Sequence, residues 1–433
     1  MEEKMGKKFF CCDAVLDSKS RQIAIFSGYA KEMQPISWAL ADKRTYVHWA
    51  EKKYDIIVFG MPTNFRELGA REEDIPKIME HERLKGEVHE GHFVPLGDAD
   101  VEAILRDPDI DTVVEVLGGL HPAYEWICRA LAGGKNVVTA NKAVISAYYR
   151  ELTALACENR VALRCTAAVG GGIPWLVNLQ RCRRVDTVTE VGGIMNGTTN
   201  FIMDAMARQG ADFPAVLQRA QELGYAEADP SADIDGDDIR RKLTISANIA
   251  FDALLREEDI PAFGIRTVTG ADVADFRAHG FTCKLLACAQ RTETGVAAYV
   301  EPALVAEGEP EAAVPGNYNL ISCTGELLGR QSYFGQGAGR YPTAANVVQD
   351  CLDLLTGEDG FYTETARPMA VEADAVAHPY YVRTQAADPW LESVTADRWD
   401  SGVITGAVPV GQMLRWAAAQ RQRDPGCFVA GIR

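Results

Sequence analysis

Residues 107–143 read DPDIDTVVEVLGGLHPAYEWICRALAGGKNVVTANKA. Two short runs rich in β-branched residues, 112–117 and 136–139, flank a stretch able to form a helix from His121 to Leu131, which Gly133 and Gly134 end. A strand, a helix and a second strand in this order are typical of the βαβ unit of a parallel sheet. The segment therefore predicts an α/β domain.

Two further apolar runs lie N-terminal to this segment, at 22–26 and 54–59, and extend the predicted parallel sheet. A nucleotide-binding sheet of this kind ordinarily opens with a strand and Gly-x-Gly-x-x-Gly, whose glycines let a pyrophosphate reach a helix N-terminus. Here the two strands run into SGYAKE (27–32) and GMPTNF (60–65), and neither fits that pattern. We expect a Rossmann-like domain over residues 1–150 with an atypical N-terminal part.

The pattern changes beyond residue 150. Strands and helices no longer alternate strictly between 151 and 335, which favours an α+β domain. A second Gly-rich turn at 335–339 precedes an amphipathic stretch. Residues 357–433 are expected to form a short separate C-terminal region.

The composition indicates which kinds of molecule the protein is expected to bind. A net charge of −17 argues against nucleic acid, because phosphate binding requires clustered Lys and Arg. No apolar run reaches the roughly 18 residues of a membrane span, and no secretory signal opens the chain, so we expect a cytoplasmic protein with a small-molecule substrate. The cysteines are odd in number and form no C-x-x-C pair, which favours reduced thiols. HEGH, at 89–92, lacks the spacing of a helical zinc site.

The densest polar signal is GYAEADPSADIDGDDIRRK, residues 224–242. Its carboxylates would repel one another unless cations lie against them, and a substrate ammonium group would serve. Asp238 and Lys242 are four residues apart and share a helical face, so the lysine could take part in proton transfer. The alternative is an acidic helix N-terminus with an ordinary surface ion pair.

A second lysine follows the strand at 136–139. The carboxyl ends of parallel strands face the ligand crevice, so Asn141 and Lys142 are expected where cofactor and substrate meet. An exposed loop lysine is the alternative. GGIMNGTTN, 192–200, places polar side chains at a helix start that would suit a carboxylate, or would simply cap the helix.

Six segments together resemble the homoserine dehydrogenase family. They are VVEVLGG, VVTANKA, AAVGGGIP, GGIMNGTTNFI, LGYAEADPSADIDGDDIRRK and YFGQGAGRYPTAANVV, in the family's order, over about residues 100–355. The resemblance implies NAD(P)-dependent interconversion of L-homoserine and L-aspartate 4-semialdehyde, in threonine, methionine and isoleucine biosynthesis. It also implies a homodimer or homotetramer, a catalytic and dimerisation role for residues 151–335, and completion of the first domain by residues 336–356.

The same resemblance assigns roles to individual residues. It implies proton transfer by Lys242 and a lysine beside the nicotinamide at Lys142. The residues it assigns to the substrate are Glu227, Asp238 and Asp233, and those it assigns to the cofactor, NADP or NAD, are Gly118, Asn141, Lys142 and Gly337.

Some members of the family hold a structural sodium ion through a glutamate and three backbone carbonyls. The matching carbonyls here are those of Val169, Gly171 and Ile173, but Thr166 stands where the glutamate is usual. The C-terminal region resembles, at Tyr380 to Arg383, the opening strand of an ACT-type regulatory module.

Three hypotheses follow. The first is an active homoserine dehydrogenase. The second is a catalytically impaired homologue with a rearranged N-terminus, which folds and binds an amino acid without efficient hydride transfer. The third, another amino-acid oxidoreductase on the same scaffold, is disfavoured by the complete run from Glu227 to Lys242.

Overall fold

The structure is a computed structural model that describes residues 13–14, 22–27, 55–59, 98–363 and 365–433. Backbone contacts divide the chain into two compact units, one of residues 1–174 with 338–364 and one of residues 175–337 with 365–433. The candidate Gly-x-Gly-x-x-Gly positions after residues 27 and 59, and the HEGH segment, lie outside the described residues. No helix in the described part has both the length and the apolar composition of a membrane span.

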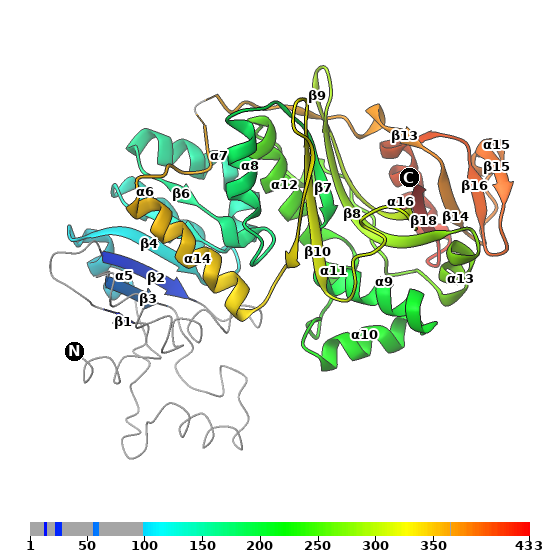
Figure 1. Ribbon diagram of the computed structural model, residues 1–433, viewed down its shortest axis with the longest axis horizontal. Helices are drawn as coiled ribbons and strands as arrows, with labels where there is room; N and C mark the ends of the chain where they lie inside the picture. Colours follow the sequence, from blue (N-terminus) through cyan, green and yellow to red (C-terminus); the bar gives the residue numbers. More distant parts are fainter. Residues whose placement is uncertain (1–12, 15–21, 28–54, 60–97, 364) are drawn as a thin grey trace, which may run out of the picture. The chain divides into compact units, whose positions relative to one another are not determined.

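The first unit is built on a mainly parallel sheet (Figure 1). Its strands follow the order β1-β3-β2-β4-β5-β6, and only the short β1 is antiparallel to its neighbour. The predicted α/β domain is confirmed. The strands are β1 Asp13–Ala14, β2 Gln22–Ser27, β3 Asp55–Phe59, β4 Ile110–Val116, β5 Asn136–Thr139 and β6 Leu163–Arg164. The helices are α5 Asp98–Arg106, α6 Ala123–Ala132, α7 Lys142–Asn159, α14 Arg340–Leu355 and the 3-10 turn η1 Thr166–Ala168.

Helix α14 joins this unit from far along the chain. Its apolar side chains, among them Val347 and Cys351, share a buried cluster with Val114 of β4 and Val138 of β5. The expected contribution of residues 336–356 to the first domain therefore has a physical basis in this packing. Residues 357–363 stay with the same unit, where the Phe361 amide donates to the Leu163 carbonyl of β6.

A buried ion-pair network fixes α14 to β6. Arg164 is 1% exposed, and its Nε lies 3.1 Å from Asp350 Oδ1 while its Nη2 lies 2.6 Å from Asp353 Oδ2. The Asp350 carboxylate, wholly buried, also accepts from the Thr166 amide at 2.8 Å and from the Thr166 hydroxyl at 2.6 Å. The Asp350 carboxylate thus accepts hydrogen bonds from both Arg164 and Thr166.

The second unit is organised around one mixed sheet with the order β11-β10-β7-β8-β9-β18-β14-β16-β15, with β12 beside β9. Its main strands are β7 Val188–Ile194, β8 Phe281–Arg291, β9 Gly295–Ala306, β10 Tyr318–Gly325, β11 Gly329–Gln336 and β12 Ala370–Val371. Its helices before residue 337 are α8 Trp175–Arg183, α9 Gly197–Gln209, α10 Phe213–Glu222, α11 Ser231–Ile234, α12 Asp237–Phe251 and α13 Gly270–Ala278, with the 3-10 turn η2 Glu257–Asp259. The predicted α+β character is confirmed.

The C-terminal residues form a βαββαβ unit, here called the C-terminal module (residues 380–433). Its strands and helices are β14 Tyr380–Arg383, α15 Pro389–Val394, β15 Thr395–Arg398, β16 Val403–Thr405, α16 Val410–Arg423 and β18 Phe428–Ile432. The strand order β18-β14-β16-β15 is that of ferredoxin-like units. Before the module lies η3 Ala373–Ala375, and β13 Ala377–His378 pairs with β17 Val408–Pro409.

This arrangement corrects the expectation of a separate region over 357–433. Strand β18 pairs in parallel with β9, with Gly431 opposite Ala303 and Ile432 opposite Leu304, so the module continues the sheet of residues 175–337. The predicted boundary at residue 150 also moves to 174, because helix α7 and strand β6 both belong to the first sheet unit. Periodicity could locate the elements but could not show which sheet the last strand joins.

Substitution of Asp350 tests the buried network. In Asp350→Ala the buried Arg164 guanidinium would lose one of its two carboxylate partners, and breaking a buried pair in this way costs about 3–5 kcal/mol. We expect that loss in the free energy of unfolding, measured by urea denaturation. Glu102→Ala, which removes a half-exposed partner of Arg129, is the matched control and should cost under about 1 kcal/mol. Equal effects of the two substitutions would contradict the assigned role.

Candidate active site

A buried lysine–aspartate pair lies at the start of helix α12. Lys242 Nζ is 2.7 Å from Asp238 Oδ2, and the two side chains are 9% and 8% exposed. The ammonium also donates to the carbonyl of Met195 at 2.9 Å. Burial on this scale excludes the alternative of an ordinary surface ion pair. A lysine held beside a carboxylate and largely out of water has the setting of a proton-transfer group.

Asn196 connects this pair to the acidic segment. Its Nδ2 donates to Asp238 Oδ2 at 2.8 Å and to Asp233 Oδ1 at 2.6 Å, while its Oδ1 accepts from the Thr199 amide and caps α9. The end of β7, the start of α9 and the start of α12 thus meet around two carboxylates and one ammonium group. Lys242, Asp238, Asn196 and Asp233 are called the acid–lysine cluster below.

The other polar residues at the start of α9 have structural partners. Asn200 donates to the carbonyls of Gly316 and Tyr318 at 2.8 and 3.1 Å, and its Oδ1 accepts from Lys284 Nζ at 2.8 Å. Burial lowers the pKa of Lys284 to about 8. Thr198 donates to the carbonyl of Tyr225 at 2.6 Å. These contacts hold the helix start to its neighbouring loops, which is the capping alternative.

Other carboxylates of the acidic segment differ in their partners and in their exposure. Asp235 forms an ion pair with Arg266, and Asp237 forms one with Arg240. Glu227 has an exposed side chain, and its carbonyl accepts from Gln221. Of the three acids expected to bind substrate, Asp238 pairs with Lys242, and Asp233 is linked to Asp238 through Asn196. Glu227 lies at the surface.

In the first unit, a buried glutamate organises the ends of two parallel strands. Glu115 in β4 is wholly buried, and its carboxylate accepts from the Leu117 amide at 2.6 Å, the Thr139 hydroxyl at 2.6 Å and the Asn141 amide group at 3.4 Å. Burial raises the pKa of Glu115, and the hydrogen bonds from Thr139 and Leu117 oppose that rise. The carboxylate thereby ties the carboxyl ends of β4 and β5 together.

Asn141 and Lys142 lie where the sequence placed them, directly after β5. Asn141 caps α7 by accepting from the Val144 amide at 3.2 Å and donates to the Gly119 carbonyl at 2.8 Å. Lys142 is the first residue of α7 and is partly buried. Gly118 has a φ of 76°, a value that favours glycine, so the turn after β4 depends on it. These residues form a glycine turn and a helix N-terminus at the carboxyl ends of adjacent parallel strands, the edge of an open α/β sheet where ligands bind.

The glycine turn at 335–339 offers a second close approach. A Cβ built on Gly337 would lie 1.9 Å from Asn319 Nδ2, so only glycine fits. Asn319 is fully buried, and within the described part of the chain its side-chain amide has no hydrogen-bond partner. A buried amide of this kind is usually hydrogen-bonded, often to an ordered water.

Most oxygens of the expected sodium site bind other side chains instead. The carbonyls of Gly171 and Ile173 accept from Asn346 Nδ2 at 2.5 and 3.0 Å, and the Thr166 hydroxyl donates to Asp350. Two of the three carbonyl oxygens thus face a side-chain amide, and the hydroxyl is already engaged with an anion. As arranged, this donor set does not fit a cation, and no part of the function is derived through one.

The sequence does not show the roles of two residues in this geometry. The pattern at 192–200 indicates Asn196 only as a helix cap or a carboxylate ligand, because spacing along the chain cannot show its contacts with Asp233 and Asp238. Glu115 carried a visible signal, since a glutamate inside the apolar run 112–117 of a parallel strand must be buried and therefore hydrogen-bonded.

Comparison with known proteins identifies the family. Residues 94–165 match the family model described as homoserine dehydrogenase, NAD binding domain, and residues 174–352 match the homoserine dehydrogenase model. A solved structure of a homoserine dehydrogenase from Thiobacillus denitrificans is 29% identical, with a TM-score of 0.77 over 96% of this chain and 98% of that one.

Curated relatives agree with the family models. The homoserine dehydrogenase of Pseudomonas aeruginosa is 39% identical over 67% of this chain and 69% of its own length. That of Synechocystis sp. is 44% identical, and the chain spans 60% of its length. By these matches, the chain belongs to the homoserine dehydrogenase family.

Proposed function

We propose that the chain is an NAD(P)-dependent homoserine dehydrogenase that interconverts L-homoserine and L-aspartate 4-semialdehyde. The observation that carries the proposal is the buried acid–lysine cluster, in which Lys242 Nζ lies 2.7 Å from Asp238. Family membership supplies the reaction class. The comparisons give no support to the alternative of a catalytically impaired homologue.

The chemistry assigns one task to each part of the cluster. Oxidation of an alcohol breaks a carbinol C–H bond and an O–H bond and forms a carbonyl. When bound, a nicotinamide cofactor would supply the hydride acceptor. The Lys242 amine takes the hydroxyl proton, and in the reverse direction the ammonium returns it to the carbonyl oxygen as hydride arrives. Asp238 stabilises the charged lysine, and Asp233 and Asp238 together offer negative charge to the substrate's ammonium group.

Residues of the first unit serve the cofactor in this proposal. Gly118, Asn141 and Lys142 form the turn and helix start at adjacent strand ends, and Glu115 holds that arrangement in place. Lys142, the first residue of α7, adds a positive charge to this cofactor site. Gly337, in the second unit, is a further residue that the family resemblance assigns to the cofactor. The proposal extends to NADP or NAD as cofactor, a homodimer or homotetramer, and a cytoplasmic location.

Replacement of Lys242 tests the proposed proton transfer. Lys242→Ala should lower kcat about 10²- to 10⁴-fold, because general acid–base catalysis contributes on that scale. The assay follows NADPH oxidation with aspartate semialdehyde. Arg241→Ala, one residue earlier on α12 and paired at the partly exposed surface with Glu257, is the control and should retain kcat. A Lys242→Ala protein with undiminished kcat would contradict the role.

Replacement of Glu115 tests the organisation of the cofactor end. Glu115→Gln keeps the shape of the side chain but places an amide donor against the Leu117 amide and the Thr139 hydroxyl, which both donate already. A buried polar group left without a partner costs about 1–3 kcal/mol. We expect NADPH binding, measured by fluorescence titration, to weaken about tenfold or more. Glu125→Gln, at an exposed position on α6, is the matched control and should leave binding unchanged. Identical titration curves for the parent and Glu115→Gln would refute the assignment.

A further inference from the structure

A short segment joins the acidic residues to the C-terminal module. We call residues 264–269 the bridge segment. It follows Phe263 and ends where helix α13 begins. Its first half contacts the loop around Asp235, and its second half contacts β14 and the turn before β18. All of these residues belong to the second unit.

The first half of the bridge segment lies against the backbone of the acidic loop. The Ile265 amide donates to the Ile234 carbonyl at 2.8 Å, and a Cβ on Gly264 would come within 2.0 Å of that same carbonyl oxygen. Arg266 then reaches back over the loop. Its Nε and Nη2 donate to the two carboxylate oxygens of Asp235 at 2.8 and 2.7 Å, and Nη2 also donates to Ser231 Oγ at 3.0 Å.

Arg266 binds residues on both sides, in sequence, of Asp233, a member of the acid–lysine cluster. Ser231 and Asp235 lie two residues before and two residues after Asp233, whose carboxylate accepts from Asn196. A fork of three hydrogen bonds on these positions limits how far Asp233 can move. It also neutralises Asp235, which would otherwise repel the carboxylates beside it.

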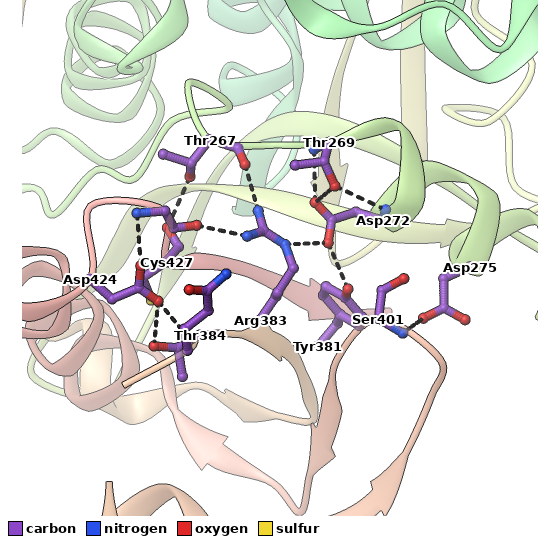
Figure 2. Close-up of polar contacts among 12 residues, drawn as sticks. Thr267, Thr269, Asp272, Asp275, Tyr381, Arg383, Thr384, Ser401, Asp424 and Cys427 are labelled. Atoms are coloured by element: carbon purple, nitrogen blue, oxygen red, sulfur yellow. Dashed lines mark hydrogen bonds and ion pairs between the residues drawn. The ribbon is translucent and has the colours of Figure 1, made fainter. Parts of the chain in front are cut away.

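The second half of the bridge segment is held by the C-terminal module (Figure 2). The Thr267 carbonyl accepts from Arg383 Nη2 at 2.6 Å, and its hydroxyl donates to the Cys427 carbonyl at 2.9 Å. Arg421 Nη2 donates to the same hydroxyl at 3.1 Å. One threonine of the bridge segment is thus clamped from β14, from α16 and from the turn before β18.

Asp272 anchors this clamp. It is wholly buried, and its Oδ1 accepts from Arg383 Nε and from the Tyr381 hydroxyl, both at 2.7 Å. Its Oδ2 accepts from the amide and the hydroxyl of Thr269, closing a capping box at the start of α13. A buried carboxylate with four donors has one favourable geometry, so the orientation of Arg383 toward Thr267 is set by it.

We propose that Arg266 is a positioning residue for the amino-acid substrate, and that Arg383 of the C-terminal module acts on the same loop through the bridge segment. The inference rests on the proposed function, because it assigns Asp233 to substrate binding. Loss of either arginine loosens the loop that carries Asp233 while leaving Lys242, Asp238 and the cofactor residues in place. The expected consequence is weaker binding of the amino acid with the chemical step retained.

Steady-state kinetics with L-homoserine test the first half of this inference. Arg266→Ala should raise the KM for homoserine about tenfold, with kcat and the KM for NADP little changed. Arg266→Lys should recover only part of the loss, because an ammonium cannot form the planar fork. Arg256→Ala is the control, since Arg256 forms the same kind of fork with Asp259 at the surface, apart from the acidic loop. Its KM for homoserine should equal the parent's.

The contribution of the C-terminal module is tested by a double-mutant cycle. Arg383→Gln should raise the homoserine KM in the same direction, and the double variant with Arg266→Ala should be less impaired than the product of the two effects, because both act through one segment. Independent, multiplying effects would overturn the proposed route. An unchanged homoserine KM in Arg266→Ala, or a fall in kcat with unchanged KM, would overturn the role of Arg266.

Amide hydrogen exchange separates this inference from the proposed function. Residues 229–238 should exchange faster in Arg266→Ala than in the parent or in Arg256→Ala, a result that needs no turnover. If exchange in this loop does not change, the inference is wrong whatever the activity. If the loop does exchange faster but the parent neither turns over nor binds homoserine in calorimetry, the proposed function fails, and the substrate role of Arg266 fails with it.

Discussion

The arrangement of the second unit depends on keeping several negative charges together inside the protein. Asp233 and Asp238 share the amide of Asn196, and Lys242 lies against Asp238 with most of its surface removed from water. Carboxylates this close are stable only with cations and donors around them. The N-cap of α9 supplies Asn196 and the first turns of α12 supply Lys242, so the starts of two helices serve one cluster.

A second buried anion plays a comparable part in the first unit. Glu115 gathers donors from the loop after β4 and from the end of β5, and this brings the Gly118 turn and the start of α7 into one arrangement. Asn141 and Lys142, at the start of α7, are placed by the same hydrogen bonds. In both units, therefore, the groups assigned to chemistry stand on strand ends and helix N-termini, whose positions are set by buried hydrogen bonds.

Much of this organisation was predictable from the sequence, and the limits have physical causes. Apolar runs and glycine stops located β4, α6 and β5, because burial on both faces of a parallel sheet leaves a continuous signal. The i, i+4 spacing placed Asp238 beside Lys242, but burial, which decides between a surface pair and a functional one, depends on packing from distant segments. The continuation of the sheet through β18 and the contact of Arg266 with Asp235 are long-range pairings that local periodicity cannot show. Asn346 against Gly171 and Ile173 is another, and it removes a cation site that motif matching alone had suggested.

Proton transfer by the buried Lys242 beside Asp238 is the step on which the proposed function depends. A crystal structure of the chain with NADP and L-homoserine tests it most directly. It should show the substrate hydroxyl within hydrogen-bond distance of Lys242 Nζ and the substrate ammonium group beside Asp233 or Asp238. Homoserine bound away from Lys242 would contradict the proposed role.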